Sequence, residues 1–234
     1  MNILVTGASR GIGAATYELL KSRGHQVVGH SSRGGSGLVA GELTDPSAPR
    51  AIWEAALSQL GGRIDSVVNN AGIYEAISAG SSDADWQAAW ERTLRINLQS
   101  AADLSRLAVA HFLGRGAGGR IVNVASRAAW RGDSADHWHY AASKAAMVAM
   151  TKTIARAYGG NDILAFAVSP GFTVSEMTEE YLTGRGGAQI LAEIPLGRVA
   201  STDEVAETIR WLATEAPPSA TGTNIDVNGA SYVR

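Results

Sequence analysis

A tyrosine and a lysine stand four residues apart, at Tyr140 and Lys144, in a stretch whose composition is typical of a helix. Residues i and i+4 share one face of a helix, so the phenol and the ammonium are expected to project into the same space. A cation beside a phenol favours the phenolate and lowers a pKa that is otherwise about 10. The pair could therefore act as a general acid/base, although this spacing also occurs on ordinary amphipathic helices.

Short apolar strands alternate with longer helical patterns along the chain, which is typical of βαβ units and a parallel sheet. A loop at 127–138 should lead into the helix 139–158 that carries the pair. Residues 34–37 are too rich in glycine for a full helix, so the second crossover should be shortened. The expected strands are 2–6, 26–30, 38–43, 65–68, 119–125, 162–168 and 224–228, and the other expected helices are 14–23, 46–60, 83–113 and one from 202.

The turn between the first strand and the first helix contains Gly7, Gly11 and Gly13. Glycine there lets the backbone approach a pyrophosphate and lets the helix pack closely on the sheet. The amino terminus of the helix offers free N–H groups to the anion. A glycine-rich turn alone is a weak signal, but its position between strand and helix favours a dinucleotide site.

Ser32 and Arg33 follow the second strand, where an acidic residue that binds the adenosine ribose would favour NAD. Arg33, together with Arg10 in the glycine turn, suits a 2′-phosphate instead, because the guanidinium fork matches phosphate oxygens. The sequence therefore favours NADP(H), with NAD(H) still possible. The alternative is that Arg33 is a solvated arginine in a flexible loop.

Small polar residues stand where two later strands end. Asn69-Asn70-Ala71-Gly72 closes the fourth expected strand, and Ser126 ends the fifth. Because open α/β sheets bind ligands at the carboxyl ends of their strands, both should border the cleft. Asn97 lies within a long expected helix, where asparagine competes for backbone groups. It either faces solvent or marks a local kink.

The 234 residues carry a net charge of −2 and include no cysteine. A chain of this length suits one domain, residues 1–234, with a sizeable core. It offers no basic patch for nucleic acid or an anionic membrane, and no run approaches the ~18 apolar residues of a membrane span. Met1 leads into a strand without an export leader, so we expect a cytoplasmic protein. His137 and His139 have no partners in a metal-binding pattern, so no metal is expected.

Taken together and in this order, the motifs resemble those of the short-chain dehydrogenase/reductase family in its compact form. The resemblance implies a Rossmann-like doubly wound parallel sheet with helices on both faces, a three-layer α/β sandwich. It also implies an NAD(P)(H)-dependent oxidoreductase that interconverts a secondary alcohol and a ketone by hydride transfer. The motifs are Thr6-Gly7-x-x-x-Gly11-x-Gly13, Asn69-Asn70-Ala71-Gly72, Asn97, Ser126, Tyr140-x-x-x-Lys144 and Pro170-Gly171.

The resemblance also implies roles for individual residues. Tyr140 matches the general acid/base, and Ser126 matches the serine that hydrogen-bonds the same substrate oxygen. Lys144 matches the lysine that lowers the tyrosine pKa and binds the nicotinamide ribose, and Asn97 matches the asparagine that holds a relay water. The matched cofactor contacts are Gly7, Ser9, Arg10, Gly11, Ile12, Gly13, Ser32, Arg33, Glu42, Leu43, Asn70, Ala71, Gly72, Tyr140, Lys144, Pro170, Gly171, Thr173 and Ser175.

Four positions depart from the family's usual residues. Glu42 stands where an aspartate is usual beside the adenine, so that contact is less secure, and Ser175 replaces a threonine. Phe166 and Asn228 replace an asparagine and an aspartate, away from the chemistry.

Two other functions on the same scaffold are considered. A relative that had become a catalytically silent redox sensor could keep the glycine turn while losing the tyrosine or the lysine, but this chain keeps Tyr140 and Lys144. Relatives with dehalogenase chemistry replace the lysine with arginine and lose the dinucleotide turn. This chain keeps both the lysine, Lys144, and the dinucleotide turn, which favours the oxidoreductase.

The sequence says less about the substrate. Residues 172–198 are expected to form a substrate-binding flap within the domain. The side chains considered for a substrate wall are Trp130, Asp133, Asp136, His137, Trp138 and His139 before the catalytic helix, and Met177, Tyr181 and Leu182 in the flap. They either line a cleft for a hydrophobic or cyclic ketone or lie at the surface or a subunit contact. By resemblance we expect a homotetramer or a homodimer.

Overall fold

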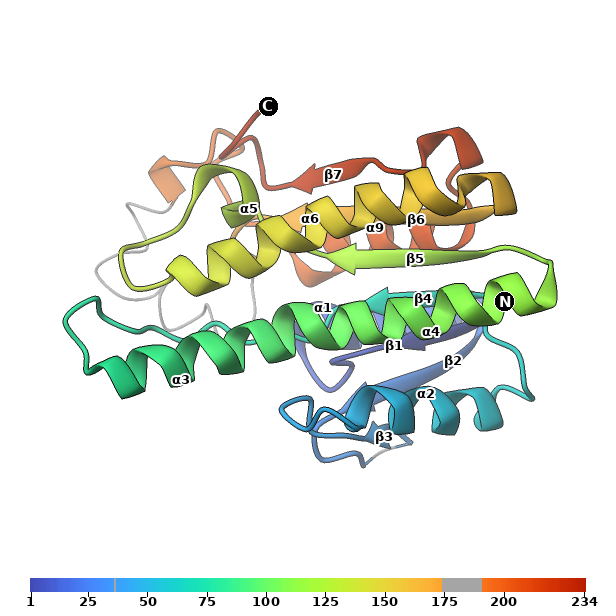
Figure 1. Cartoon of the computed structure of the whole chain (residues 1–234). Helices are drawn as coiled ribbons and strands as arrows, with labels where there is room; N and C mark the ends of the chain where they lie inside the picture. Colours follow the sequence, from blue (N-terminus) through green and yellow to red (C-terminus); the bar gives the residue numbers. More distant parts are fainter. Residues whose placement is uncertain (36, 174–190) are drawn as a thin grey trace.

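A parallel sheet of seven strands forms the centre of the computed structural model, which describes residues 1–35, 37–173 and 191–234. The strand order is β3-β2-β1-β4-β5-β6-β7 (Figure 1). The strands are β1 (Asn2–Val5), β2 (Gln26–Ser31), β3 (Val39–Ala40), β4 (Ser66–Asn69), β5 (Gly119–Val124), β6 (Ile163–Pro170) and β7 (Asn224–Val227). The helices are α1 (Gly11–Ser22), α2 (Ala48–Gln59), α3 (Asp83–Leu94), α4 (Ser100–Arg115), α5 (Ala128–Arg131), α6 (Trp138–Tyr158) and α9 (Thr202–Thr214), with a π-helical turn η1 (Arg95–Gln99) and the 3₁₀ turns η2 (Gly159–Asn161) and η3 (Pro218–Ala220).

The strand order reverses at β1, which pairs in parallel with β2 on one side and with β4 on the other. Leu4 therefore lies opposite both Val28 and Val67. In an open α/β sheet this switch point leaves a crevice outside the carboxyl ends of the strands, where ligands bind. The predicted doubly wound parallel sheet is confirmed.

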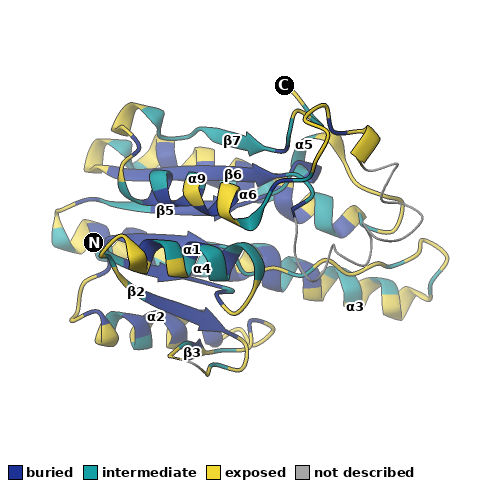
Figure 2. Cartoon of the chain, turned by 180° about the vertical axis from the view of Figure 1, so that it is seen from behind, coloured by how far each residue is buried: buried dark blue, intermediate teal, exposed yellow. Residues whose placement is uncertain are grey.

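Helices cover both faces of the sheet. On the face toward the viewer in Figure 1, α2, α4 and α6 pack around Ile52 and Phe112. On the face seen in Figure 2, α1 and α9 pack around Leu20 and Ile209. All four side chains are 0% exposed, and burying each contributes about 1.5–3 kcal/mol. The predicted three-layer sandwich is confirmed, with a core on each side of the sheet.

Three local predictions were wrong. The third strand is the two-residue β3 rather than 38–43, because the chain turns away after it and the Asp45 N–H donates to the Glu42 carbonyl at 2.9 Å. The loop at 127–138 contains the short helix α5. The long helix expected at 83–113 is divided into α3 and α4 by the π-helical turn.

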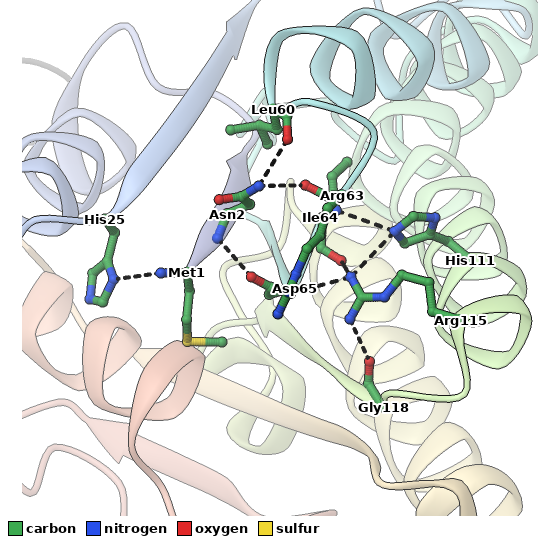
Figure 3. A network of polar contacts seen from close by, with 10 residues as sticks. All are labelled: Met1, Asn2, His25, Leu60, Arg63, Ile64, Asp65, His111, Arg115 and Gly118. Carbon is green, nitrogen blue, oxygen red and sulfur yellow. Dashed lines mark hydrogen bonds and ion pairs between the residues drawn. The ribbon is translucent and has the colours of Figure 1, made fainter.

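A polar network at the amino ends of β1 and β4 joins the sheet to α4 (Figure 3). Asp65, only 7% exposed, accepts from the Asn2 N–H at 2.9 Å, from Arg63 Nε at 2.7 Å and from Arg115 Nη1 at 3.2 Å. Burial alone would raise the pKa of Asp65, but these donors outweigh it and hold the pKa below its ordinary value. The network lies at the end of the sheet opposite the carboxyl ends and serves the stability of the fold.

We expect Asp65→Asn to lower the free energy of unfolding by about 1–3 kcal/mol at neutral pH, because it removes a charged acceptor from three donors. The folded pKa is depressed, so this contribution is present above the unfolded pKa of about 3.9 and is lost as the pH falls through the folded value. Urea titrations of the two proteins should therefore converge in acid. A difference that stays constant with pH would contradict this assignment.

Candidate active site

The carboxyl ends of four neighbouring strands bring the predicted site residues to one edge of the sheet. Gly7 follows β1, Asn70 follows β4, Ser126 follows β5, and β6 ends at Pro170. In Figure 1 the arrows of β4, β5 and β7 point toward the end of the molecule where α5 and the start of α6 lie. Tyr140, in the first turn of α6, is thereby brought to this edge.

Tyr140 and Lys144 share a face of α6, as their spacing predicts. Lys144 Nζ lies 5.7 Å from the centroid of the Tyr140 ring. The lysine is 4% exposed, and its Nζ donates to the Val124 carbonyl at the end of β5, at 2.8 Å. The ammonium is therefore held by the sheet, beside the phenol and beneath the cleft.

The pKa values of the two groups move in the directions that burial dictates. Burial raises the pKa of Tyr140 to about 12, which a hydrogen bond with the Ser126 side chain partly offsets and the charge of Asp133 reinforces. Burial lowers the pKa of Lys144 to about 8. In the chain alone, loss of hydration thus raises the tyrosine pKa, which is opposite to the direction expected from a neighbouring lysine.

Asn97 faces the site, not the solvent. It is 0% exposed and lies in η1, where the helix widens into a π turn. Its Oδ1 accepts from the Ile73 N–H at 2.8 Å, and its Nδ2 donates to the Ile73 carbonyl at 3.0 Å and to Ser143 Oγ at 3.3 Å. Of the two alternatives left by the sequence, the local kink is correct. The kink turns the amide toward α6 and the loop that follows β4.

Gly72 brings that loop into close approach with the site. A Cβ at this position would lie 3.3 Å from Asn97 Oδ1 and 3.5 Å from Lys144 Nζ. Any larger residue would crowd the two side chains. Asn97, Lys144 and the backbone of Gly72 therefore meet at one point.

The glycine turn fits a pyrophosphate. Gly7 and Gly11 have φ of 66° and 56°, in the left-handed region that favours glycine. A Cβ at Gly13 would collide with the Gly7 carbonyl oxygen and with Asn70 Nδ2. Ile12 is partly buried, while Ser9 and Arg10 are exposed at the amino terminus of α1. The turn thus presents backbone and polar side chains where an anion would meet the helix.

Two residues that hold the turn were missed as site residues by the sequence analysis. Thr6 Oγ1 accepts from the Asn70 and Ala71 N–H groups at 3.0 and 3.1 Å. Asn70 Nδ2 in turn donates to the Thr6 and Gly7 carbonyls, which locks the turn to the segment after β4. His30, 2% exposed, accepts from the Gly7 N–H at 3.4 Å and bonds the Gly41 carbonyl through Nε2 at 2.8 Å. Only Thr6 carried a signal, as part of the quoted motif.

The adenosine end is open, with Ser32, Arg33 and Glu42 all exposed. Neither Arg10 nor Arg33 lies within 4.0 Å of a carboxylate among the described residues, so both guanidinium groups are available to an anion. Leu43 is different, because it is 4% exposed and packs in the core under α2.

The segment after β6 completes the edge. The Gly171 N–H donates to the Val227 carbonyl at 3.0 Å, and a Cβ at Gly171 would lie 2.8 Å from that of Asn228. Thr173 is 6% exposed, and its hydroxyl donates to the Gly171 carbonyl at 3.3 Å. Ser175 lies outside the described residues, as do Met177, Tyr181, Leu182 and most of the expected flap.

Comparison with known proteins agrees with this geometry. Residues 7–230 match the family described as "Enoyl-(Acyl carrier protein) reductase". The chain is 33% identical to 3-oxoacyl-[acyl-carrier-protein] reductase FabG of Escherichia coli K12, over 98% of this chain and 96% of that protein. It is 34% identical to the FabG of Vibrio cholerae, with the same coverage, and 33% identical to that of Thermotoga maritima, over 98% and 97%. The chain belongs to the short-chain dehydrogenase/reductase family.

As a short-chain dehydrogenase/reductase, the chain is an NAD(P)(H)-dependent oxidoreductase that interconverts a secondary alcohol and a ketone. Its similarity to reductases favours the enzyme over the silent redox sensor. Within the described residues, no helix is long and apolar enough to cross a membrane. The same part of the chain holds no group of three or more histidine, aspartate or glutamate side chains that could bind a metal.

The residues considered for the substrate wall of this short-chain dehydrogenase/reductase divide into two groups. His137 and Asp133 reach Tyr140 through Tyr74, whose ring packs against that of Tyr140. The others lie elsewhere. Trp138 is 54% exposed and packs against Trp86 of α3. His139 is fully buried and packs against Trp90 of the same helix. Trp130 contacts the cations of Lys152 and Arg234. Asp136 is exposed, and its carbonyl accepts from the Ile77 N–H.

Proposed function

We propose that Tyr140 gives a proton to the oxygen of a ketone during its reduction to a secondary alcohol. The observation that carries the proposal is the meeting of Tyr140, Ser126 and Lys144 at one edge of the sheet, with Lys144 Nζ 5.7 Å from the centroid of the Tyr140 ring. With a pKa of about 12 the Tyr140 phenol keeps its proton, and with a pKa of about 8 the Lys144 amine is charged. A protonated phenol can act as general acid, and the cation favours the phenolate left behind. The dinucleotide supplies the hydride when bound.

Two further side chains support this chemistry. Ser126, hydrogen-bonded to Tyr140, is placed to share the substrate oxygen and to stabilise the charge that develops there. Asn97 holds the loop after β4 against Ser143 of α6. We also propose that it holds the water of the proton relay, as the family resemblance implies. A fixed donor and a fixed loop reduce the reorganisation needed when the substrate reacts.

The proposed cofactor is NADP(H). The glycine turn leaves room for a pyrophosphate because side chains are excluded at Gly7 and Gly13. Beyond it, the exposed guanidinium groups of Arg10 and Arg33 lie where a 2′-phosphate would be read, with no acidic residue at the end of β2. A guanidinium binds a phosphate through parallel, charge-assisted hydrogen bonds. NAD(H) lacks that phosphate and would gain nothing from Arg33.

Arg33→Ala should weaken NADPH binding by about 10- to 100-fold and leave NADH binding nearly unchanged, because hydrogen bonds to charged groups contribute about 1.5–3 kcal/mol. Fluorescence titration with each dinucleotide measures both constants. Arg50→Ala is a matched control, since Arg50 is an exposed arginine that pairs with Glu54 on α2. Equal losses for the two dinucleotides would count against 2′-phosphate recognition.

For the substrate we propose a 3-oxoacyl thioester, on the ground that the similar proteins are 3-oxoacyl-[acyl-carrier-protein] reductases. The description of the matched family makes reduction of an enoyl thioester the competing reaction. Two hydroxyl groups, Ser126 and Tyr140, that can share one oxygen favour the ketone, because its reduction ends with a proton on that oxygen, whereas reduction of an enoyl thioester ends with a proton on carbon. NADPH oxidation with a 3-oxoacyl and a trans-2-enoyl thioester, side by side, distinguishes the two. Turnover of neither would refute the substrate class.

The proposal also covers the organisation of the protein. We propose that residues 1–234 are one dinucleotide-binding domain, with residues 172–198 as the substrate-binding flap. We further propose a cytoplasmic homo-oligomer, a tetramer or a dimer, in line with the family resemblance. Native mass spectrometry of the purified protein would test the assembly.

A further inference from the structure

A second tyrosine packs directly against the proposed acid. Tyr74 lies two residues beyond Gly72, in the loop after β4. Its ring centroid is 4.7 Å from that of Tyr140, and the two ring planes meet at 83°. This edge-to-face geometry is one of the arrangements that aromatic pairs prefer. Tyr74 is also 39% exposed, so its position is not dictated by burial in the core.

Tyr74 is held from its other side by the loop before α6. Its ring stacks on that of His137, with centroids 3.8 Å apart and planes 5° from parallel. Its hydroxyl donates to Asp133 Oδ1 at 3.1 Å, and the same oxygen accepts from the Ser134 N–H at 2.8 Å. Ser134 Oγ in turn bonds His137 Nδ1 at 2.7 Å. Stacking and hydrogen bonds thus hold the Tyr74 ring at both its face and its tip.

Two further polar groups lie near the Tyr140 ring in the part of the chain that the structure describes. Within the described residues its hydroxyl has the hydrogen bond with Ser126, and Lys144 lies on the adjacent turn of α6. Misplacing a reacting group by about 1 Å can cost ~10²-fold in rate. The packing that fixes the plane of the Tyr140 ring therefore matters to catalysis.

From this geometry we infer that Tyr74 is a positioning residue, which fixes the ring of Tyr140 for proton transfer and is itself held by Asp133 and His137. The inference rests on the proposed function of Tyr140. Tyr74 needs no contact with the reacting atoms, since it acts on the orientation of the acid. Tyr74, Asp133 and His137 therefore act as one unit. A substitution that weakens the contacts of Asp133 or His137 with Tyr74 should also make the ring of Tyr140 less well fixed.

The charge of Asp133 adds a second readout. It raises the pKa of Tyr140 and of Tyr74, so neutralising it should lower the pKa of Tyr140. The other groups near the phenol are Ser126, which follows β5, Lys144 of α6 and the Tyr74 phenol, and none of these residues is replaced in an Asp133 variant. Reduction needs the protonated phenol, so Asp133→Asn should move the alkaline fall of the reduction rate toward lower pH.

The test compares two substitutions at position 74 in single-turnover reduction of a ketone by bound NADPH. Tyr74→Leu removes the edge-to-face contact between the two rings. The free energy of such a contact corresponds to about a tenfold change in rate, so hydride transfer should slow about tenfold. Tyr74→Phe keeps the ring and loses only the hydrogen bond to Asp133, so its rate should lie between the rates of the wild type and of Tyr74→Leu. NADPH affinity and the melting temperature should stay close to wild type.

Trp86→Leu is the matched control, because it removes a similar edge-to-face pair, with Trp138 at 5.4 Å and 86°, that does not touch Tyr140. Its rate should stay at the wild-type value. In a Tyr140→Phe background, Tyr74→Leu should cause no further loss, since the residue to be positioned can no longer donate a proton.

Three outcomes of the rate measurements would overturn the inference. They are an unchanged rate in Tyr74→Leu, an equal fall in Trp86→Leu, and full additivity with Tyr140→Phe. An Asp133→Asn profile that does not move would remove Asp133 from the unit and overturn the inference in the form given. If Tyr140→Phe itself kept full turnover, the proposed function would fail and the positioning role with it. The outcomes at positions 74, 86 and 133 test the positioning role alone, so the two kinds of failure can be told apart.

Discussion

Tyr140→Phe should lower the rate of ketone reduction by about 10²–10⁴-fold, the range typical of general acid/base catalysis. The phenyl ring keeps the packing against Tyr74 and the place beside Lys144, so only the proton donor is removed. Because a pKa of about 12 keeps the phenol protonated across neutral pH, the wild-type protein loses this donor only in strong alkali. The loss of rate in the variant should therefore be nearly constant between about pH 6 and pH 8.

Single-turnover NADPH oxidation measures this prediction, and two comparisons separate chemistry from folding. The affinity for NADPH should stay close to that of the wild type in Tyr140→Phe, since the substitution removes one hydroxyl group and leaves the glycine turn between β1 and α1 unchanged. Ser126→Ala should retain more activity than Tyr140→Phe, because the phenol remains to donate the proton. Preserved turnover in Tyr140→Phe would rule out the assignment of the acid.

Local signals in the sequence were sufficient for the alternation of strands and helices and for the helix that carries Tyr140 and Lys144. The glycines at 7, 11 and 13 sit in a turn whose geometry only glycine tolerates, and the expected helix follows, although it begins at Gly11 rather than after Gly13. The spacing of Tyr140 and Lys144 needs only a helix to bring them together, and α6 supplies it. These features depend on residues close in sequence, where periodicity and turn chemistry determine the structure.

Contacts between distant segments could not be predicted in this way. Thr6 and Asn70 are 64 residues apart, and Tyr74 and Asp133 are 59 apart, yet each pair is hydrogen-bonded. The support of Gly7 by His30 depends on the pairing of β1 with β2, which brings the buried imidazole beside the turn. No periodicity or motif spacing in a single sequence carries such information.

The electrostatics of the site were also beyond the sequence. Spacing places an ammonium near Tyr140, but it says nothing of how much water each group loses on folding. In the structure burial raises one pKa and lowers the other, which is opposite to the sequence expectation for the tyrosine. The sign follows from competition between desolvation and charge, and only the packing around each group decides it.

Gly13→Ala should weaken dinucleotide binding by about 10- to 100-fold and lower the free energy of unfolding by about 1–3 kcal/mol. The added methyl would collide with the Gly7 carbonyl and with Asn70 Nδ2, so α1 or the turn must shift. Because Asn70 Nδ2 donates to the Thr6 and Gly7 carbonyls, a shift also breaks the lock between β1 and β4. Loss of affinity and loss of stability are thus expected to occur together.

Fluorescence titration with NADPH and urea unfolding measure the two effects. Gly114→Ala is the matched control, because Gly114 lies in α4 with open space where its Cβ would be. That substitution should leave NADPH binding unchanged and stabilise the helix by roughly 0.5–1 kcal/mol. If Gly13→Ala bound NADPH as tightly as wild type, the pyrophosphate would not lie on this turn, and the cofactor would have to enter the cleft by another route.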